Sequence, residues 1–475
     1  MTAKSPQIPL ICMICASFSL LCISCGCAWR SQKISTMGLS MNNVRDFGAV
    51  GDGKHNDTAS IQRALDAGGM VHLPDGVYRC GTLYLRSNGG LHLSDNARIV
   101  ASHDVADYNA LEYCSQNEDC PEEFVSGRHL ISAVEVENIL IEGGTIDGDG
   151  RFWTLGPWGN RPVLKPNPER PAQMVFIVES KNVTLRNVKL TNASYWHCLL
   201  LGCENVDVTG LAVLADPQII NSDGLDIDSC RQVRVSDCDI RSGDDALTLR
   251  ASAYLLKEQR PCEDVVVKNC RLSSEYATGI RIGVGNGLIR NCELENLEIT
   301  HCKTGFSLIG KWGDTADSCG ASISDVRISN VRLWCMRPFA IGLDHRYNAP
   351  ISNPAKCVFE NVRFEKIHGR AELSNHIEGN GVGMIRDFLF KDIELKYEGV
   401  GKAPFRDGKG QWSVDSDDVM FAIDNAINIR FENVVLHSNG QWKAELRKSS
   451  SSTVWWDNPN WIIDNVDQYV PFLGF

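Results

Sequence analysis

The sequence predicts an all-β fold, a single-stranded right-handed parallel β-helix with a short N-terminal capping helix. A motif of two short strands around an Asn, Asp or Gly bend recurs along the chain. Copies that begin at 182, 205, 232 and 264 are spaced by 23, 27 and 32 residues, about one coil each. No helical periodicity competes there, and one strand pair cannot bury its own apolar face. Stacked copies must therefore share a continuous core.

The start of the chain predicts an export signal over residues 1–29. Lys4 precedes a run of almost wholly apolar or small residues, 8–23, which contains no acidic residue. This run is short for a membrane span. Cys25 and Cys27 each follow a small residue, as at a bacterial lipoprotein cleavage site. We expect an exported protein, either periplasmic, extracellular or an outer-membrane lipoprotein with a lipid anchor at Cys25 or Cys27.

Composition restricts the partners. The formal net charge of −12 argues against nucleic acid as the main partner. A chain of 475 residues suits two domains or one elongated repeat, and the recurring motif favours a single domain over residues 40–475. β-Helices of this length are expected to be monomers. The chain has no phosphate loop, serine triad or metal-ligand cluster with suitable spacing, so no metal and no cofactor are expected.

Residues 57–69 predict the capping helix. Asp57 is a favourable N-cap residue, Ile61 and Leu65 share one helical face, and Gly68 is a suitable terminator. Such a helix would cover the open end of the solenoid, whose first coil otherwise exposes its core. Alternating apolar residues then predict the first strands, at 71–78, 83–85 and 91–93.

The repeat then predicts the coils one after another. Its copies begin at 138, 182, 205, 232 and 264, with weaker copies at 323, 357, 385 and 427. Residues 148–171, rich in Gly, Pro and Trp, and residues 398–416, rich in Gly and Lys, interrupt it. Long loops on a repeat scaffold commonly carry the binding face, so both segments are expected on the solenoid wall.

Cysteine positions predict two local features. Cys114 and Cys120 bracket a short polar loop and could form a disulfide in an oxidising compartment. Cys238, Cys270 and Cys292 each follow an Asp or Asn in the repeat, which indicates a column of buried thiols rather than a disulfide framework.

Three acids near the middle of the chain indicate a reactive site. Asp223 and Asp244 are 21 residues apart, about one coil, and Asp245 follows directly. Residues one coil apart lie beside each other, on strands roughly 4.8 Å apart. Clustered carboxylates raise one another's pKa, so one can stay protonated beside an ionised one. Cleavage of a glycosidic bond requires such a pair.

The alternative is that these acids only cap turns, as Asp commonly does. Asp226 and Asp228 fit that interpretation. Two adjacent carboxylates gain little from capping a single turn, so the pair Asp244 and Asp245 favours a catalytic role.

Cationic and aromatic residues near the acids are further candidates. Arg250 and Arg281 lie close to them in coil register and could bind substrate anions or form surface ion pairs. His197, one coil before the first acid, could meet a hydroxyl or be a structural histidine. Trp196 and Trp312 could stack on a sugar ring. Three other tryptophans are expected to pack in the core or at the C-terminal end: Trp334, Trp455 and Trp456.

From residue 46 to about residue 310 the chain resembles glycoside hydrolase family 28, the pectin-degrading polygalacturonases and rhamnogalacturonases. The likeness includes segments 46–53 and 143–150, and its most specific part pairs residues 221–226 with 243–245. The resemblance implies an inverting single displacement. Asp244 would be the general acid that protonates the leaving oxygen.

In the same scheme, Asp223 and Asp245 would orient and deprotonate the attacking water. An inverting site needs room for that water, with carboxyl groups about 6.5–9.5 Å apart. We expect acids on neighbouring coils to provide this gap at one open cleft.

Two departures from the family concern the substrate. Thr278 stands where the family has a His, and Ser307-Leu-Ile309 aligns with its Arg-Ile-Lys motif. Arg281 or Lys311 could replace the missing cations. We therefore predict a related glycan, either a substituted pectin such as rhamnogalacturonan or a non-pectic anionic polysaccharide. The expected substrate-binding residues are Asn221, Asp226, His197, Arg250, Arg281, Lys311 and Trp312.

Two other functions remain open for this scaffold. A polysaccharide lyase or epimerase would abstract a proton next to a carboxylate, usually with Ca²⁺ or a basic residue over the acid. A non-catalytic glycan-binding β-helix would also explain the missing His and Arg/Lys motif.

Overall fold

The computed structural model describes residues 41–117, 123, 125–312, 319–344, 354–397, 419–438, 444–457 and 468–471. The chain divides into residues 1–35 and residues 36–475, and every described residue belongs to the second unit. The export signal, Cys120 and the loop 398–416 lie outside the described residues, so the predictions about them stay predictions. Within the described ranges, no helix is long and apolar enough to cross a membrane.

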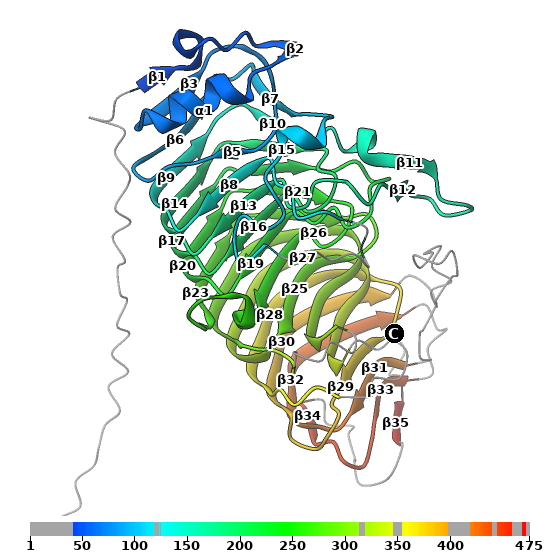
Figure 1. Ribbon diagram of the computed structural model, residues 1–475. Helices are drawn as coiled ribbons and strands as arrows, with labels where there is room; N and C mark the ends of the chain where they lie inside the picture. The colour runs from blue at the N-terminus through cyan, green and yellow to red at the C-terminus, as the bar shows by residue number, and fades with distance from the viewer. Residues whose placement is uncertain are drawn as a thin grey trace, which may run out of the picture. The chain divides into compact units, whose positions relative to one another are not determined.

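The second unit is the right-handed parallel β-helix that the repeat predicted (Figure 1). Its strands form three walls, and each coil contributes one strand to each wall. The long strands β26 (Leu288–Lys311) and β27 (Ser322–Asp344) run through all three walls. β28 (Phe359–Ala371), β30 (Ile385–Tyr397) and β32 (Ala426–Ser438) run through the first two.

The other strands each belong to one wall. The first wall adds β1 (Met41–Asn43), β3 (Met70–Leu73), β6 (Gly89–Leu93), β9 (Glu137–Glu142), β14 (Lys181–Arg186), β17 (Glu204–Thr209), β20 (Arg231–Ser236), β23 (Cys262–Lys268) and β34 (Val454–Trp456). The second adds β2 (Asp52–Asn56), β4 (Gly76–Cys80), β7 (Ala97–Ala101), β10 (Thr145–Asp147), β15 (Lys189–Thr191), β18 (Ala212–Leu214), β21 (Asp239–Ser242) and β24 (Arg271–Ser274).

The third wall carries the acids at the starts of its strands. It adds β5 (Leu83–Tyr84), β8 (Ile131–Val134), β13 (Val175–Val178), β16 (Cys198–Leu201), β19 (Leu225–Asp228), β22 (Leu247–Ala251), β25 (Thr278–Gly285), β29 (Asn375–Glu378), β31 (Val419–Asp424), β33 (Ala444–Lys448) and the antiparallel β35 (Gln468–Pro471).

Asparagines at the corners explain why the repeat copies begin as they do. Asn138, Asn182 and Asn205 have φ of 57°, 54° and 56°, in the left-handed region that Asn tolerates better than most residues. Their side-chain amides form a ladder, with Asn182 donating to Asn138 at 2.7 Å and Asn205 donating to Asn182 at 2.6 Å. The corner therefore fixes the backbone bend and the stacking of successive coils together.

The capping helix forms as α1 (Thr58–Asp66), with Ile61 and Leu65 buried beneath it. It packs beside β3 and β5 at the N-terminal coil (Figure 1). Asp57 precedes it but does not cap it, so that detail of the prediction is wrong. Its carboxylate instead accepts hydrogen bonds from the backbone N–H groups of Val50 at 2.7 Å and Gly51 at 3.0 Å. The carboxylate of Asp57 therefore stabilises the preceding loop and not the N-terminus of the helix.

Short helices and one hairpin complete the described elements. The predicted loop 148–171 contains a 3₁₀ helix, η4, and the two-stranded antiparallel sheet β11–β12, which projects from the coils (Figure 1). The bounds are η1 (Val44–Phe47), η2 (Val105–Asp107), η4 (Gly150–Trp153), β11 (Thr154–Pro157), β12 (Leu164–Pro166) and η5 (Ala253–Leu255).

Buried thiols stack as expected, but not in one column. Cys238 and Cys270 are buried and interact with each other, whereas Cys292 lies on the first wall, in β26. A second stack joins Cys203 to Cys230, since the backbone N–H of Cys203 donates a hydrogen bond to the Sγ atom of Cys230 at 3.2 Å. The prediction of one column is wrong because the bend before Cys292 resembles the other two in sequence but lies at a different position in the coil.

Two of the three tryptophans that were expected to pack are exposed. Trp456 is 8% exposed and stacks on Phe431, as predicted. Trp455 is 70% exposed and Trp334 is 49% exposed, which corrects the prediction for both. The reason is strand alternation, since the neighbours of Trp334, Leu333 and Cys335, point into the core.

Candidate functional site

The three predicted acids meet at one end of two neighbouring strands of the third wall. Asp223 precedes β19, and Asp244 and Asp245 precede β22. Because Leu225 pairs with Leu247, the first acid lies beside the last. One carboxylate oxygen from each lies within 4.8 Å of the others. Neighbouring coils therefore bring the three carboxyl groups to one place.

Two glycines permit this close approach. A Cβ atom at Gly224 would lie 2.4 Å from the carbonyl oxygen of Ala246 and from a methyl group of Ile240. A Cβ atom at Gly243 would lie 2.3 Å from the hydroxyl of Ser222. Both contacts are too short for any larger residue without movement of the loops. The glycines beside the acids therefore have a steric role.

Arg281 holds the carboxylate of Asp245 on two sides. Its Nη2 donates to Oδ1 at 3.1 Å and its Nε donates to Oδ2. The backbone N–H of Thr278 donates a third hydrogen bond, at 3.1 Å. Arg281 is 8% exposed, and its guanidinium carbon lies 5.1 Å from the ring centre of Trp312. The acid cluster therefore contains one carboxylate with a buried counter-ion.

The other two acids have raised pKa values. Burial, together with the negative charge of Asp245, raises the pKa of Asp244 to about 7. Burial and the charge of Asp244 raise the pKa of Asp223 well above its ordinary value. Asp244 is the part-exposed member of the three. A carboxyl group that keeps a proton near neutrality thus lies beside an ion-paired carboxylate.

Arg250 forms a second cationic position on the other side of the acids. Its Nη1 lies 3.8 Å from Asp226, its Nε lies 3.8 Å from Asp228, and its guanidinium carbon lies 4.7 Å from the ring centre of Trp196. Asp226 is fully buried and accepts a hydrogen bond from Thr248 at 2.5 Å. Burial raises the pKa of Asp226 to about 7, and Arg250 partly opposes this shift. Asp226 therefore supports Arg250 rather than facing solvent.

Besides the buried Asp226, two more predicted substrate-binding residues lie out of reach. His197 is fully buried, with Nδ1 2.8 Å from the carbonyl oxygen of Asp223 and Nε2 3.4 Å from the backbone nitrogen of Ala193. Burial lowers its pKa to about 4, so the ring is neutral and structural. Lys311 is also fully buried. The prediction that either contacts substrate is wrong, because each points beneath the surface.

Arg170, which the sequence did not single out, connects the long loop to the acid-bearing segment. It is 1% exposed and donates to the carbonyl oxygens of Ser194 at 2.8 Å, Ile220 at 3.0 Å and Glu123 at 2.8 Å. It also donates to the side chain of Asn221 at 3.1 Å. One of three arginines in a Gly/Pro-rich loop carries no periodic signal, so only the folded structure identifies it.

We expect Arg170→Lys to loosen Asn221 while keeping the positive charge. One ammonium group cannot make four fixed hydrogen bonds to three segments, and lost buried hydrogen bonds cost about 1–3 kcal/mol. Urea unfolding should show that loss. The effect on turnover should be about tenfold, measured on the glycan that the native protein cleaves. The exposed substitution Arg271→Lys is the control, and equal effects of the two would contradict a positioning role for Arg170.

Comparison with known proteins identifies similar sequences. The family model described as Glycosyl hydrolases family 28 matches residues 115–408, and that of Rhamnogalacturonase A/epimerase, pectate lyase-like, matches residues 41–88. A probable polygalacturonase of Vitis vinifera is 25% identical over 326 residues, which cover 65% of this chain and 63% of that protein. An endo-polygalacturonase of Pectobacterium parmentieri is 24% identical over 398 residues, which cover 79% of this chain and 87% of that protein.

Solved structures give the same fold. A family 28 exopolygalacturonase of Yersinia enterocolitica matches with a TM-score of 0.63 at 19% identity, over 88% of this chain and 78% of that one. The structural match supports the β-helix, and the family model, which covers more than half of the chain, supports common ancestry.

Proposed function

Because the chain belongs to glycosyl hydrolases family 28, we propose that it hydrolyses a glycosidic bond in a pectin-like or other acidic polysaccharide. One observation carries the proposal. Asp244, with a pKa of about 7, lies beside Asp245, which is paired with a buried arginine. A proton donor and a carboxylate at one position are the two groups that this reaction needs.

In the proposed mechanism, Asp244 protonates the leaving glycosidic oxygen. Asp245, held in place by Arg281, orients the attacking water together with Asp223 and accepts its proton. The new C–O bond forms on the opposite face of the sugar, which inverts the anomeric centre. NMR of the reaction products tests inversion, because it shows which anomer forms first. Retention of the anomeric configuration would exclude direct attack by this water.

Two arginine–aromatic pairs support an acidic sugar. Arg250 with Trp196 lies on one side of the carboxylates and Arg281 with Trp312 lies on the other. Trp312 is 45% exposed, so its ring can stack on a sugar. Nη1 of Arg281 is buried and has no hydrogen-bond partner within the described ranges. The two arginines and their aromatic partners therefore suit a carboxylated or sulfated sugar.

Unbranched polygalacturonate is not the proposed substrate. Thr278 replaces the family's His, and Ser307 with Ile309 replaces its cations. All three side chains are uncharged and buried, so none supplies a positive charge to the site. We propose a substituted pectin such as rhamnogalacturonan, or a non-pectic anionic polysaccharide.

A screen of pectic and sulfated polysaccharides tests the function. We expect new reducing ends from at least one acidic polymer, at a rate that falls as pH rises through about 7, when Asp244 loses its proton. Product size then separates endo from exo action. An unsaturated product absorbing in the ultraviolet would instead indicate a lyase. Binding without any product would indicate a glycan-binding protein.

We also propose export of the chain and a single folded domain over residues 40–475, acting as a monomer. The apolar run 8–23 supports export, and the continuous stack of coils from β1 onward supports one domain. Labelling cells with a radioactive fatty acid tests the lipid anchor at Cys25 or Cys27.

A further inference from the structure

The hairpin β11–β12 lies in a turn that enters the third wall, as the proposed catalytic acids do. The hairpin precedes β13, and Asp223 precedes β19, two coils further along. Turns that enter the same wall stack along one edge of the solenoid, so the hairpin and the acids share an edge. Two strand spacings, roughly 10 Å, separate the coils from which they arise.

Contacts bring the hairpin closer to the acids than this spacing suggests. The backbone N–H of Leu164 donates to the carbonyl oxygen of Gln218 at 2.9 Å. Arg151, just before β11, donates to the side chain of Gln218 at 2.7 Å and pairs with Asp216. Both partners belong to the turn that leads into Asp223. The hairpin is therefore fixed against the acid-bearing turn.

The hairpin segment is basic in an acidic chain. Residues 150–168 contain Arg151, Arg161 and Lys165 but no acidic residue, whereas the whole chain has a formal net charge of −12. Arg151 is used in the pair with Asp216. Within the described ranges, Arg161 and Lys165 form no ion pair. A local charge opposite in sign to that of the chain favours an anionic ligand at this place.

Arg161 is held in an orientation that suits an acidic group. Its guanidinium carbon lies 3.9 Å from the ring centre of Trp158, and its backbone N–H donates to the carbonyl oxygen of Trp158 at 3.2 Å. Both residues are half-buried and lie in the loop that joins the two strands of the hairpin. A guanidinium stacked on an aromatic ring keeps N–H groups at its rim, where they can pair bidentately with a carboxylate or sulfate.

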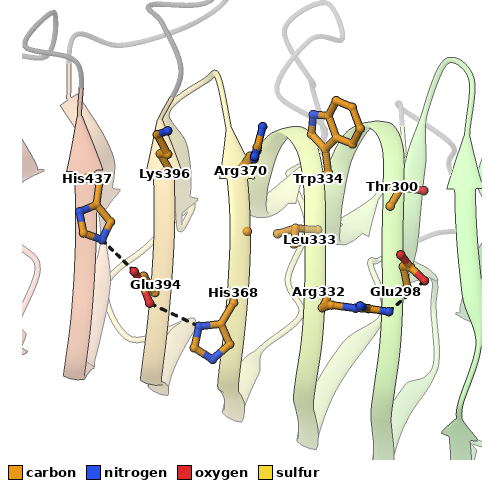
Figure 2. A pocket seen from close by; sticks show the side chains of 11 residues that line it. Glu298, Thr300, Arg332, Leu333, Trp334, His368, Arg370, Glu394, Lys396 and His437 are labelled. Atoms are coloured by element: carbon orange, nitrogen blue, oxygen red, sulfur yellow. Dashed lines mark hydrogen bonds and ion pairs between the residues drawn. The ribbon is translucent and has the colours of Figure 1, made fainter.

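The groove on the second wall, of about 880 Å³, differs in this respect (Figure 2). Arg332 lies 3.3 Å from Glu298, and His368 lies 3.7 Å from Glu394. The other basic side chains that line the groove also interact with groups of the protein: Arg370, Lys396 and His437. The groove therefore does not indicate an anionic ligand, and the hairpin does.

We propose that the hairpin forms a binding subsite for an acidic unit of the substrate, and that Arg161 pairs with the carboxylate or sulfate of this unit. The inference rests on the proposed function, since the bound unit belongs to the polysaccharide chain whose glycosidic bond lies at the acids. Trp158 orients the arginine, and Lys165 adds positive charge. The subsite thereby selects polymers that carry acidic groups away from the cleaved bond.

Affinity electrophoresis in gels containing rhamnogalacturonan, polygalacturonate or chondroitin sulfate tests the subsite. All proteins carry Asp244→Asn, so that hydrolysis does not change the gel. We expect Arg161→Gln to weaken retention by at least one of these polymers about tenfold, and Trp158→Leu to weaken it about threefold. The matched controls are Arg363→Gln and Trp455→Leu, both exposed and both on the first wall. Thermal unfolding checks that each variant is folded.

Chemical change of the polymer tests the role of the arginine. Reduction of the carboxyl groups keeps the sugar chain of polygalacturonate and rhamnogalacturonan but removes its charge. The tenfold difference between Arg161→Gln and its parent should then disappear. A difference that persists on the neutral polymer would overturn the pairing of Arg161 with an acidic group.

The outcomes are separable from those of the proposed function. With Asp244 intact, Arg161→Gln should raise KM for the cleaved polymer by a factor similar to the loss of retention. If a polymer is cleaved but its retention does not depend on Arg161, the subsite is overturned and the hydrolase proposal stands. No retention by any of the three polymers, equal losses in the control variants or equal retention by DNA would also overturn the subsite. Retention that depends on Arg161 without any cleavage would support the subsite and refute hydrolysis.

Discussion

Asp244→Asn is expected to lower kcat by about 10²–10⁴-fold, the range that a general acid contributes. Asparagine keeps the shape of the side chain and removes the proton that the leaving oxygen needs. Binding of polymer should stay within about twofold of the native value, since no charge on the substrate pairs with this group. Reducing-end release and affinity electrophoresis measure the two quantities.

The control for this variant is Asp237→Asn. Asp237 occupies an exposed corner and accepts a hydrogen bond from Asn269, at a position type that other coils fill with asparagine. The same chemical change there should leave turnover unchanged. Native turnover in Asp244→Asn would remove this residue from the mechanism.

The same variant should also become more stable than the native protein as pH rises. The pKa of Asp244 is raised from 3.8 to about 7 on folding, so the folded state favours the neutral form. Below about pH 4 both states of the native protein are protonated, and the two proteins should differ little. Between about pH 4 and 7 the native protein loses stability that Asp244→Asn keeps, on the order of a few kcal/mol. Urea unfolding at pH 4 and pH 8 measures the difference.

Arg281→Gln is expected to damage both folding and activity. It leaves the carboxylate of Asp245 buried without its counter-ion, a change that costs about 3–5 kcal/mol. Turnover should fall about 10²-fold, because the remaining hydrogen bond from Thr278 does not fix both oxygens. Urea unfolding and reducing-end release are the measurements.

A double variant separates the two effects of Arg281. Arg281→Gln combined with Asp245→Asn removes both charges and should recover most of the unfolding free energy, but no activity. Arg271→Gln is the control for loss of a cation, since Arg271 forms an exposed pair with Asp239. If the double variant were no more stable than Arg281→Gln, the ion pair would not be the cause.

Much of the fold could be predicted because each coil repeats a local rule. An asparagine such as Asn182 both adopts the left-handed bend and stacks on the preceding coil, so the sequence carries the corner and the spacing together. The meeting of Asp223 with Asp245 followed from the length of one coil. Their separation did not, because it depends on which wall positions become partners in register.

Other features depend on tertiary contacts that no repeat encodes. Lys311 and His197 lie near the acids in sequence register, yet both are fully buried. Arg170 is far from the acids in the repeat, yet it reaches Asn221. The carboxylate of Asp57 was assigned to the helix beside it but bonds to the loop before it. In each case the direction of the side chain determines its contacts, and the spacing of residues in the sequence does not reveal that direction.

The stacked thiols have a consequence for the resistance of the chain to oxidation. Burial raises the pKa of Cys230 well above its ordinary value, so almost no thiolate is present to attack an oxidant. Once unwound, the same chain exposes sulfhydryls that can cross-link in wrong pairs. The fold therefore protects its own thiols from oxidation, and the lifetime of the chain under oxidising conditions depends on rapid folding and rare unfolding.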